Sequence, residues 1–264
     1  MKKIKLLVRT ILSVFTAAIL LGAIPACSSR QPTKTGPKYV AHRGYSHSYL
    51  ANTEEAFRAA ARMTFYGIET DIRKTKDGYF VCNHDATVKY ADKSELTISS
   101  AKLDALLEKP LENDKTDEDA YLCTFEKYLR ACKEGKKVAV IELKESFAIK
   151  DLRSILAIID REYDRKKVTF ISFSYYPLGL LRQEAPSIPL QYLSQEENDP
   201  KFKACLNNGI SIDVKQTILT EELVTTFHDA GLTVNVWTVN DEEDLQTALQ
   251  LGVDYITTDL FHEE

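Results

Sequence analysis

Four short segments of this chain carry side chains that could bind a phosphodiester and move protons, and each lies at or near the end of a strand-like run. The segments are His42-Arg43-Gly44, Glu69-Thr70-Asp71, His84-Asp85 and Glu142-Leu143-Lys144. Carboxylates hold divalent cations, imidazoles transfer protons near neutral pH, and Arg and Lys neutralise phosphate oxygens. Together these residue types predict metal-assisted attack on a phosphodiester.

The spacing within two of these segments places their charged side chains together. Glu69 and Asp71 are two residues apart, so both leave the same face of a strand, and Glu142 and Lys144 do the same. Three oxygen ligands, with space for water and phosphate oxygens, suit Ca²⁺ or Mg²⁺ better than Zn²⁺. We expect Arg43 and Lys144 to bind the phosphate, although Lys144 could instead pair with Glu142.

The order of the segments along the chain resembles the glycerophosphodiester phosphodiesterase family, from residue 38 to the end. The runs that carry the resemblance are AHRGYSHSYLANTEEAF, GIETDIRKTKDGYFVCNHD, IELK, ISFS, NVWTVN and GVDYITTD. The resemblance implies a phospholipase C-like phosphodiesterase TIM barrel. It further implies His42 and His84 as the acid/base pair, and Glu69, Asp71 and Glu142 as ligands of one divalent cation. It also suggests that Trp237 lines the pocket wall, where core packing is the alternative.

One departure from the family pattern lies in the first loop. This chain has Leu50-Ala51 where the family usually has Pro-Glu, ahead of Asn52-Thr53. The acidic side chain is missing from this position, while Asn52 is retained as a candidate helix cap. None of the residues to which chemistry is assigned is lost.

The remaining pattern predicts a single (β/α)₈ TIM-type barrel over residues 39–264. Eight largely apolar runs, YVAH, IETDI, VAVIEL, VTFISF, PLQYL, ISIDV, TVNVWTV and YITT, alternate with helical patterns. Five glycines between a helical pattern and the next strand are predicted to end helices in the left-handed conformation. Asn52 and Asn240, each followed three residues later by Glu, are predicted helix N-caps. An open doubly wound sheet is the alternative, but no glycine-rich nucleotide loop supports it.

A ninth strand-like run, YFVCNH (79–84), interrupts this alternation. Only a few turn residues separate it from IETDI, too few for a parallel return, so it should fold back as a hairpin. A turn centred near Asp77 places His84 opposite Thr70, to within a residue or two. The extra hairpin strand therefore brings an imidazole beside Glu69 and Asp71.

The N-terminal residues predict export. Lys2, Lys3, Lys5 and Arg9 precede an uncharged stretch from Thr10 to Ser29. We expect a lipoprotein-type signal peptide over residues 1–26, a lipidated Cys27 and a tether over residues 27–38. The alternatives are a signal peptide cut without lipidation and an uncleaved anchor. We expect the lipid anchor to provide the only membrane contact, on the periplasmic or extracellular side of a bacterial membrane.

Charge argues against nucleic acid as a partner and favours a small-molecule substrate. Removal of residues 1–26 takes away four of the 34 Lys and Arg residues and none of the 39 Asp and Glu residues, which leaves a formal charge of −9. The leading prediction is hydrolysis of glycerophosphodiesters to glycerol 3-phosphate and an alcohol. The alternatives are lysophospholipid or teichoic-acid-like substrates, and a lipoprotein that binds phosphodiesters without turning them over.

Overall fold

The computed structural model describes residues 36–260, which form the barrel that the sequence predicts. The predicted signal peptide, Cys27 and most of the tether lie outside the described residues. No helix within residues 36–260 is long and apolar enough to cross a membrane.

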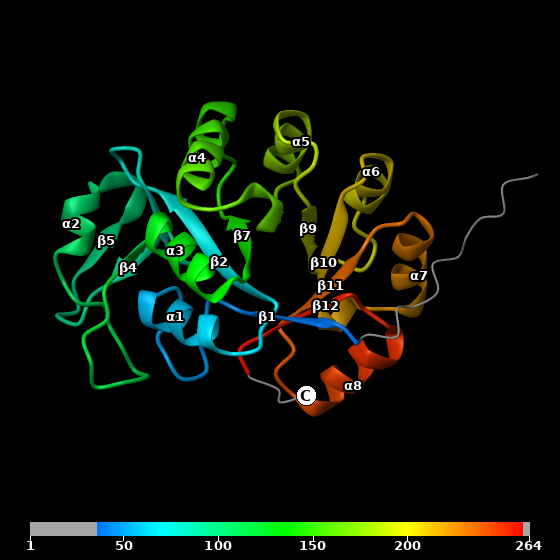
Figure 1. The fold of residues 1–264 in the computed structure, drawn as a ribbon, viewed down its shortest axis with the longest axis horizontal. Helices are drawn as coiled ribbons and strands as arrows, with labels where there is room; N and C mark the ends of the chain where they lie inside the picture. Colours follow the sequence, from blue (N-terminus) through cyan, green and yellow to red (C-terminus); the bar gives the residue numbers. More distant parts are fainter. Residues whose placement is uncertain (1–35, 261–264) are drawn as a thin grey trace, which may run out of the picture.

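Eight parallel strands close into a ring, with helices around the outside (Figure 1). The strands of the ring are β1 (Lys38–Ala41), β2 (Gly67–Lys74), β7 (Val138–Leu143), β8 (Val168–Ser172), β9 (Leu190–Ser194), β10 (Ser211–Lys215), β11 (Val234–Trp237) and β12 (Tyr255–Thr258). The ring closes because β1 pairs with both β12 and β2. All eight correspond to the eight predicted runs, so the barrel prediction is confirmed and the open sheet is excluded.

The helices between these strands cover the outer face of the ring (Figure 1). They are α1 (Glu54–Arg62), α3 (Phe125–Gly135), α4 (Ile149–Glu162), α5 (Tyr175–Glu184), α6 (Lys201–Asn207), α7 (Glu221–Asp229) and α8 (Glu242–Leu251), while α2 (Leu103–Leu107) packs in a separate insertion. The main apolar core lies between helices and strands, where Phe57, Phe125 and Phe170 are fully buried. Because alternate strand residues face opposite ways, the separate cluster of Val40, Val140, Ile171 and Leu193 fills the barrel interior.

The predicted hairpin is present with the predicted register. Strand β3 (Phe80–Cys82) runs antiparallel to β2, with Ile72 opposite Cys82, and the Asn83 amide continues the ladder to the Asp71 carbonyl oxygen. This register places His84 opposite Thr70. Strand β3 also pairs with β6 (Cys123–Thr124), which the sequence reading missed.

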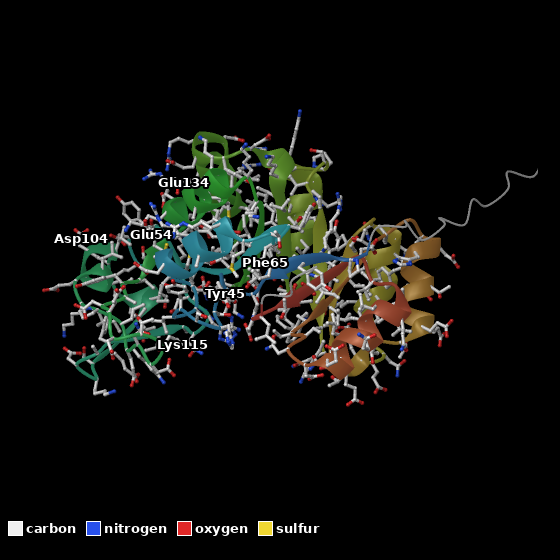
Figure 2. All side chains as sticks on the ribbon, turned by 60° about the horizontal axis from the view of Figure 1, so that its bottom comes forward. Tyr45, Glu54, Phe65, Asp104, Lys115 and Glu134 are labelled. Carbon is white, nitrogen blue, oxygen red and sulfur yellow. The ribbon has the colours of Figure 1, made fainter. Side chains whose placement is uncertain are left out.

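The segment between β3 and β6 forms a small insertion with its own apolar cluster. Strands β4 (Thr87–Lys89) and β5 (Glu95–Thr97) pair with each other, and helix α2 follows them. Val88, Tyr90 and Leu106 are buried together there. Figure 2 shows Asp104 and Lys115 of this segment at one end of the molecule. These short strands carry few apolar residues, which explains why the sequence pattern did not reveal them.

The five glycines predicted to end helices in the left-handed conformation divide into two kinds. Gly209, Gly231 and Gly252 have positive φ angles as predicted, but Gly67 and Gly135 do not. Lys136 takes the left-handed position after α3 instead. A Cβ atom on Gly135 would lie 2.6 Å from the carbonyl oxygen of Ala61, so this glycine allows α3 to approach α1 closely. Figure 2 shows Glu54 of α1 and Glu134 of α3 near one another.

We predict that Gly135→Ala destabilises the protein by about 1–3 kcal/mol, because the added methyl group must displace backbone rather than a flexible side chain. Gly179→Ala is the matched control, since Gly179 lies within helix α5 and its added Cβ would have no atom closer than 3.8 Å. That variant should stabilise by about 0.5–1 kcal/mol. Urea unfolding of both variants measures the difference, and equal behaviour would contradict the close-approach explanation.

Candidate active site

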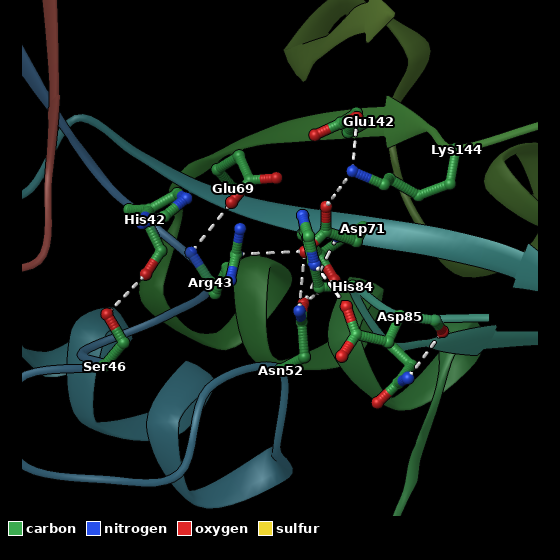
Figure 3. A network of polar contacts seen from close by, with 12 residues as sticks. His42, Arg43, Ser46, Asn52, Glu69, Asp71, His84, Asp85, Glu142 and Lys144 are labelled. Atoms are coloured by element: carbon green, nitrogen blue, oxygen red, sulfur yellow. Dashed lines mark hydrogen bonds and ion pairs between the residues drawn. The ribbon is translucent and has the colours of Figure 1, made fainter. Parts of the chain in front are cut away.

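Residues at or near the carboxyl ends of all eight barrel strands, and His84 after hairpin strand β3, meet around one pocket of about 240 Å³. Parallel strands present their carboxyl ends at the same edge of a barrel, which is why segments far apart in sequence converge here. Seven predicted site residues line the pocket: His42, Arg43, Glu69, His84, Glu142, Lys144 and Trp237. Asp71 is fully buried and joins them through polar contacts (Figure 3).

The three predicted metal ligands form one compact cluster. Oxygen atoms of Glu69, Asp71 and Glu142 all lie within 4.8 Å of one another, and all three side chains are buried. The parallel register of β2 and β7 sets Asp71 opposite Glu142, while Glu69 leaves the same face of β2 two residues earlier. Three clustered carboxylate oxygens are the donors that Mg²⁺ and Ca²⁺ prefer, so the residues fit a divalent cation.

Burial and mutual repulsion shift the pKa values of these carboxyl groups. Burial and the nearby charges of Asp71 and Glu142 raise the pKa of Glu69 well above its ordinary value. Burial, together with the charge of Asp71, raises the pKa of Glu142 to about 7, although Lys144 opposes the shift. Burial would also raise the pKa of Asp71, but Arg43, Lys144 and a hydrogen bond from Asn52 hold it below its ordinary value.

Two cations compensate part of this negative charge. The Arg43 Nε atom lies 3.2 Å from Asp71 Oδ2, and the Arg43 backbone amide donates to Glu69 Oε2 over 2.8 Å. Lys144 Nζ lies 2.9 Å from Glu142 Oε1 and 3.4 Å from Asp71 Oδ1 (Figure 3). The carboxylate pairing of Lys144 that the sequence left open is therefore present, and phosphate contact by Arg43 and Lys144 stays a prediction.

His42 is held by Asp259, which was not predicted from the sequence as a site residue. His42 Nδ1 lies 2.7 Å from Asp259 Oδ1, and Ser46 Oγ donates to the same oxygen over 2.7 Å. Asn240 Nδ2 donates to the other Asp259 oxygen. Burial opposes ionisation of Asp259, but the hydrogen bonds from His42, Ser46 and Asn240 keep its pKa below the ordinary value. A carboxylate on Nδ1 fixes the ring orientation and leaves Nε2 for proton transfer.

His84 has a comparable but more exposed carboxylate partner. His84 Nδ1 lies 2.8 Å from Asp85 Oδ1. Arg73 holds the backbone of His84 by donating two hydrogen bonds to its carbonyl oxygen. Burial and the charge of Arg43 lower the pKa of His84, against the opposing effect of Asp71. A lowered pKa favours the neutral imidazole near pH 7. In the view of Figure 3, Arg43 lies between the two histidines.

Both asparagines predicted as helix caps serve the site instead, so those two cap assignments were wrong by one residue. Thr53 caps α1 and Asp241 caps α8. Asn52 has a positive φ angle and donates to Asp71 Oδ2 over 2.7 Å. Asn240 holds Asp259 through both its amide nitrogen and its amide oxygen. Because Thr53 and Asp241 cap the two helices, the side chains of the neighbouring asparagines can make tertiary hydrogen bonds instead.

The Leu50-Ala51 departure leaves the charged cluster intact. Leu50 packs against the apolar cluster of the insertion, and its carbonyl oxygen accepts a hydrogen bond from Thr53 Oγ1. Asn52, directly after it, still reaches Asp71. The missing acidic side chain therefore does not change the set of carboxylates within the cluster.

The opposite wall of the pocket contains aromatic and apolar residues with one buried acid. Trp237 lines the pocket, donates through Nε1 to the Asp213 carbonyl oxygen over 3.2 Å, and contacts Phe173 edge-on. Trp237 also packs against the apolar cluster inside the barrel, so pocket lining and packing coexist. Asp213 is 1 % exposed, and burial raises the pKa of its carboxyl group well above the ordinary value.

Asp259 and Asp213 were not predicted as site residues, although the sequence contains a signal for each. Asp259 directly follows strand β12, and the strand-end rule that found Glu142 and Lys144 would have identified it. Asp213 interrupts the apolar run ISIDV. Burying an acid inside a barrel costs free energy unless a partner compensates it, so this residue could have been identified as a candidate site residue. Neither could be assigned a partner without the barrel register.

Comparison with known proteins agrees with this site. Residues 42–262 match the model of the "Glycerophosphoryl diester phosphodiesterase family". A glycerophosphodiester phosphodiesterase from Caldanaerobacter subterraneus subsp. tengcongensis is 27 % identical over 225 residues, covering 83 % of this chain and 93 % of the relative. The structure of a glycerophosphodiester phosphodiesterase from Parabacteroides distasonis is similar with a TM-score of 0.73 and 27 % identity, covering 85 % of this chain and 93 % of that one.

A phosphodiesterase from Oleispira antarctica, solved in complex with the product sn-glycerol-3-phosphate, has the same fold. Its TM-score is 0.74 at 19 % identity, with 84 % of this chain and 93 % of that chain covered. The chain belongs to the glycerophosphoryl diester phosphodiesterase family and is an enzyme of that class.

We predict that metal affinity depends on pH through Glu142. Protons compete with the cation for this carboxylate below its pKa of about 7, because only the ionised form is a good ligand. Titration calorimetry with Mg²⁺ and with Ca²⁺ should therefore give binding that weakens as the pH falls through about 7, with Glu142 alone contributing up to about tenfold per pH unit. Glu142→Gln should bind more weakly with a flatter pH profile. A pH-independent affinity in the unmodified protein would contradict the prediction.

Proposed function

We propose that this protein hydrolyses glycerophosphodiesters to sn-glycerol 3-phosphate and an alcohol, using a His42/His84 acid/base pair and one divalent cation. The cation is Mg²⁺ or Ca²⁺, held by Glu69, Asp71 and Glu142. The observation that carries the proposal is the convergence on one pocket of two histidines, each bonded to its own aspartate, beside a buried cluster of three carboxylates.

Proton transfer falls to the two histidines. His42, with Nδ1 bonded to Asp259, directs Nε2 at reacting atoms in the pocket, and His84 faces the same pocket with Nδ1 bonded to Asp85. One imidazole takes the proton of the attacking hydroxyl, and the other gives a proton to the departing alcohol oxygen. The nucleophile is either water or the neighbouring glycerol hydroxyl. Attack by the hydroxyl would release the alcohol and form a cyclic phosphate, which water must then open, with the two imidazoles exchanging roles, to give glycerol 3-phosphate.

Charge on the phosphoryl group is neutralised at the side of the pocket that holds the carboxylate cluster. A cation held by Glu69, Asp71 and Glu142 would supply Lewis-acid polarisation there. Arg43 and Lys144 line the same pocket and donate hydrogen bonds to the remaining oxygens as negative charge develops. Their existing contacts to Asp71 and Glu142 hold both side chains at the edge of the carboxylate cluster before substrate arrives.

The direct test measures glycerol 3-phosphate release from glycerophosphocholine and glycerophosphoethanolamine. We expect activity with Mg²⁺ or Ca²⁺, loss of activity in EDTA, and recovery on adding the cation back. His42→Asn and His84→Asn should each lower kcat by about 10²–10⁴-fold, the usual contribution of general acid/base catalysis.

The matched control is His228→Asn. His228 also pairs with an aspartate, Asp254, but does not line the pocket, so this variant should retain activity. Activity that survives EDTA would exclude the metal, and full activity of either pocket variant would exclude that histidine from proton transfer. Turnover of lysophosphatidylcholine alone would move the substrate assignment to lysophospholipids.

We further propose that the protein is exported and anchored through a lipid on Cys27. The support is the basic, then uncharged N-terminal sequence that ends at this cysteine. In cell fractionation, the unmodified protein should appear with membranes and give an acylated N-terminal peptide by mass spectrometry. Cys27→Ser should lose both properties, while Ser28→Ala keeps them. Membrane association that persists in Cys27→Ser would favour an uncleaved anchor.

A further inference from the structure

Asp213 is a buried acid in this pocket that the chemistry above does not use. It lies on strand β10 with its side chain inside the barrel, and it is 1 % exposed while still lining the pocket. Its Oδ1 atom has no hydrogen-bond partner among the described residues. A buried carboxyl oxygen without a partner costs free energy, so its presence calls for a partner that arrives with a ligand.

The neighbouring strands leave Asp213 Oδ1 without a hydrogen-bond donor from the described residues. The strand register places Leu193 on one side of Asp213 and Asn235 on the other. Leu193 offers no donor. The Asn235 amide also donates to Thr257 Oγ1, over 3.1 Å, and to Gln191 Oε1, over 3.4 Å. Asp213 also lines the pocket, so a ligand bound there would lie next to it.

The pocket therefore has two chemically different ends. At one end lie Arg43, Lys144 and the carboxylate cluster, the groups suited to a phosphoryl group and its cation. At the other end, across the ring from β2, Asp213 lines the pocket together with the apolar side chains of Leu193 and Trp237. A ligand that spans the pocket needs a phosphate at one end, a short carbon skeleton along the wall and a hydrogen-bond donor at the other end.

We propose that Asp213 determines specificity by binding a free hydroxyl of the substrate's glycerol moiety. This inference rests on the proposed function and names the part of the substrate that the enzyme recognises. A hydroxyl can donate to the ionised carboxyl group and can both donate to and accept from the protonated one, so it satisfies Asp213 in either state. The quaternary ammonium of a choline group donates no hydrogen bond and leaves Oδ1 unpaired.

The test compares phosphate monoesters that differ only in what they present to Asp213. Calorimetry in Mg²⁺ would measure binding of sn-glycerol 3-phosphate, ethyl phosphate, which lacks the hydroxyls, and phosphocholine, which presents a cation. The unmodified protein should bind glycerol 3-phosphate roughly 10–100-fold more tightly than ethyl phosphate, the range expected for a hydrogen bond to a charged group.

Variants then assign this preference to Asp213. Asp213→Ala should bind glycerol 3-phosphate and ethyl phosphate equally. Ethyl phosphate binding should change by no more than about twofold, because this ligand has no hydroxyl to donate to Asp213, and the difference between the two ligands isolates the hydroxyl contact. Asp213→Asn keeps one carbonyl oxygen and should retain part of the preference. Asp199→Asn is the control. Asp199 is a buried acid of the same half of the barrel, satisfied by Tyr192 and Ser194, and it does not line the pocket.

Three other outcomes of these binding measurements would overturn the proposal. A preference that survives in Asp213→Ala, or equal weakening of all three ligands, would make the role of Asp213 structural. Weakening confined to phosphocholine would assign a cation to it. If Asp213→Ala does not fold, equal binding of glycerol 3-phosphate and ethyl phosphate by the unmodified protein is sufficient to reject the idea. Selective binding without turnover would contradict the proposed function and leave the assignment of Asp213 intact.

Discussion

Three carboxyl groups buried within 4.8 Å of one another repel strongly, and the rest of this site is arranged around that repulsion. The pairing of β2 with β7 creates it, because the register sets Asp71 opposite Glu142 inside the barrel. Arg43 and Lys144 bring positive charge to the cluster, and Asn52 donates a hydrogen bond to it. Such a cluster of buried charge is a poor source of stability and a good binding site for a cation.

The charged cluster also explains the uneven character of the barrel interior. Apolar side chains such as Val140 and Ile171 fill one layer, and hydrophilic residues, among them Gln191, Asn235 and Thr257, occupy the strands across from the cluster. The interior therefore provides apolar support beneath the reacting groups and hydrogen-bonding groups beside them. Helices outside the ring supply most of the apolar burial, which frees the inner face to carry polar residues.

Features set by local chain geometry were predictable from the sequence. The eight apolar runs gave the barrel, and the shortness of the turn around Asp77 gave the hairpin register that brings His84 to the pocket. The family-specific runs led to the acid cluster, because strand ends in a barrel meet at one edge.

Features set by tertiary competition were not predictable in the same way. Asn52 and Asn240 satisfy the cap pattern in sequence, but each holds an aspartate from a distant segment while its neighbour caps the helix. Local sequence rules cannot predict which of two neighbouring residues caps the helix, because the answer depends on the tertiary hydrogen-bond partners that the barrel supplies. The short strands β4, β5 and β6 were missed for a related reason, since their pairing within and beside the insertion outweighs weak local preference.

The location of His84 on the hairpin separates the two histidines mechanically. His42 follows a strand that is locked between two others in the closed ring, and its backbone amide bonds to β12. His84 stands where a strand outside the ring leads into an insertion that has an apolar cluster of its own. Changes in the length or packing of that insertion can therefore move His84 relative to the pocket without disturbing the ring or the carboxylate cluster. The two imidazoles of the pocket are in this sense carried on separately adjustable parts of one chain.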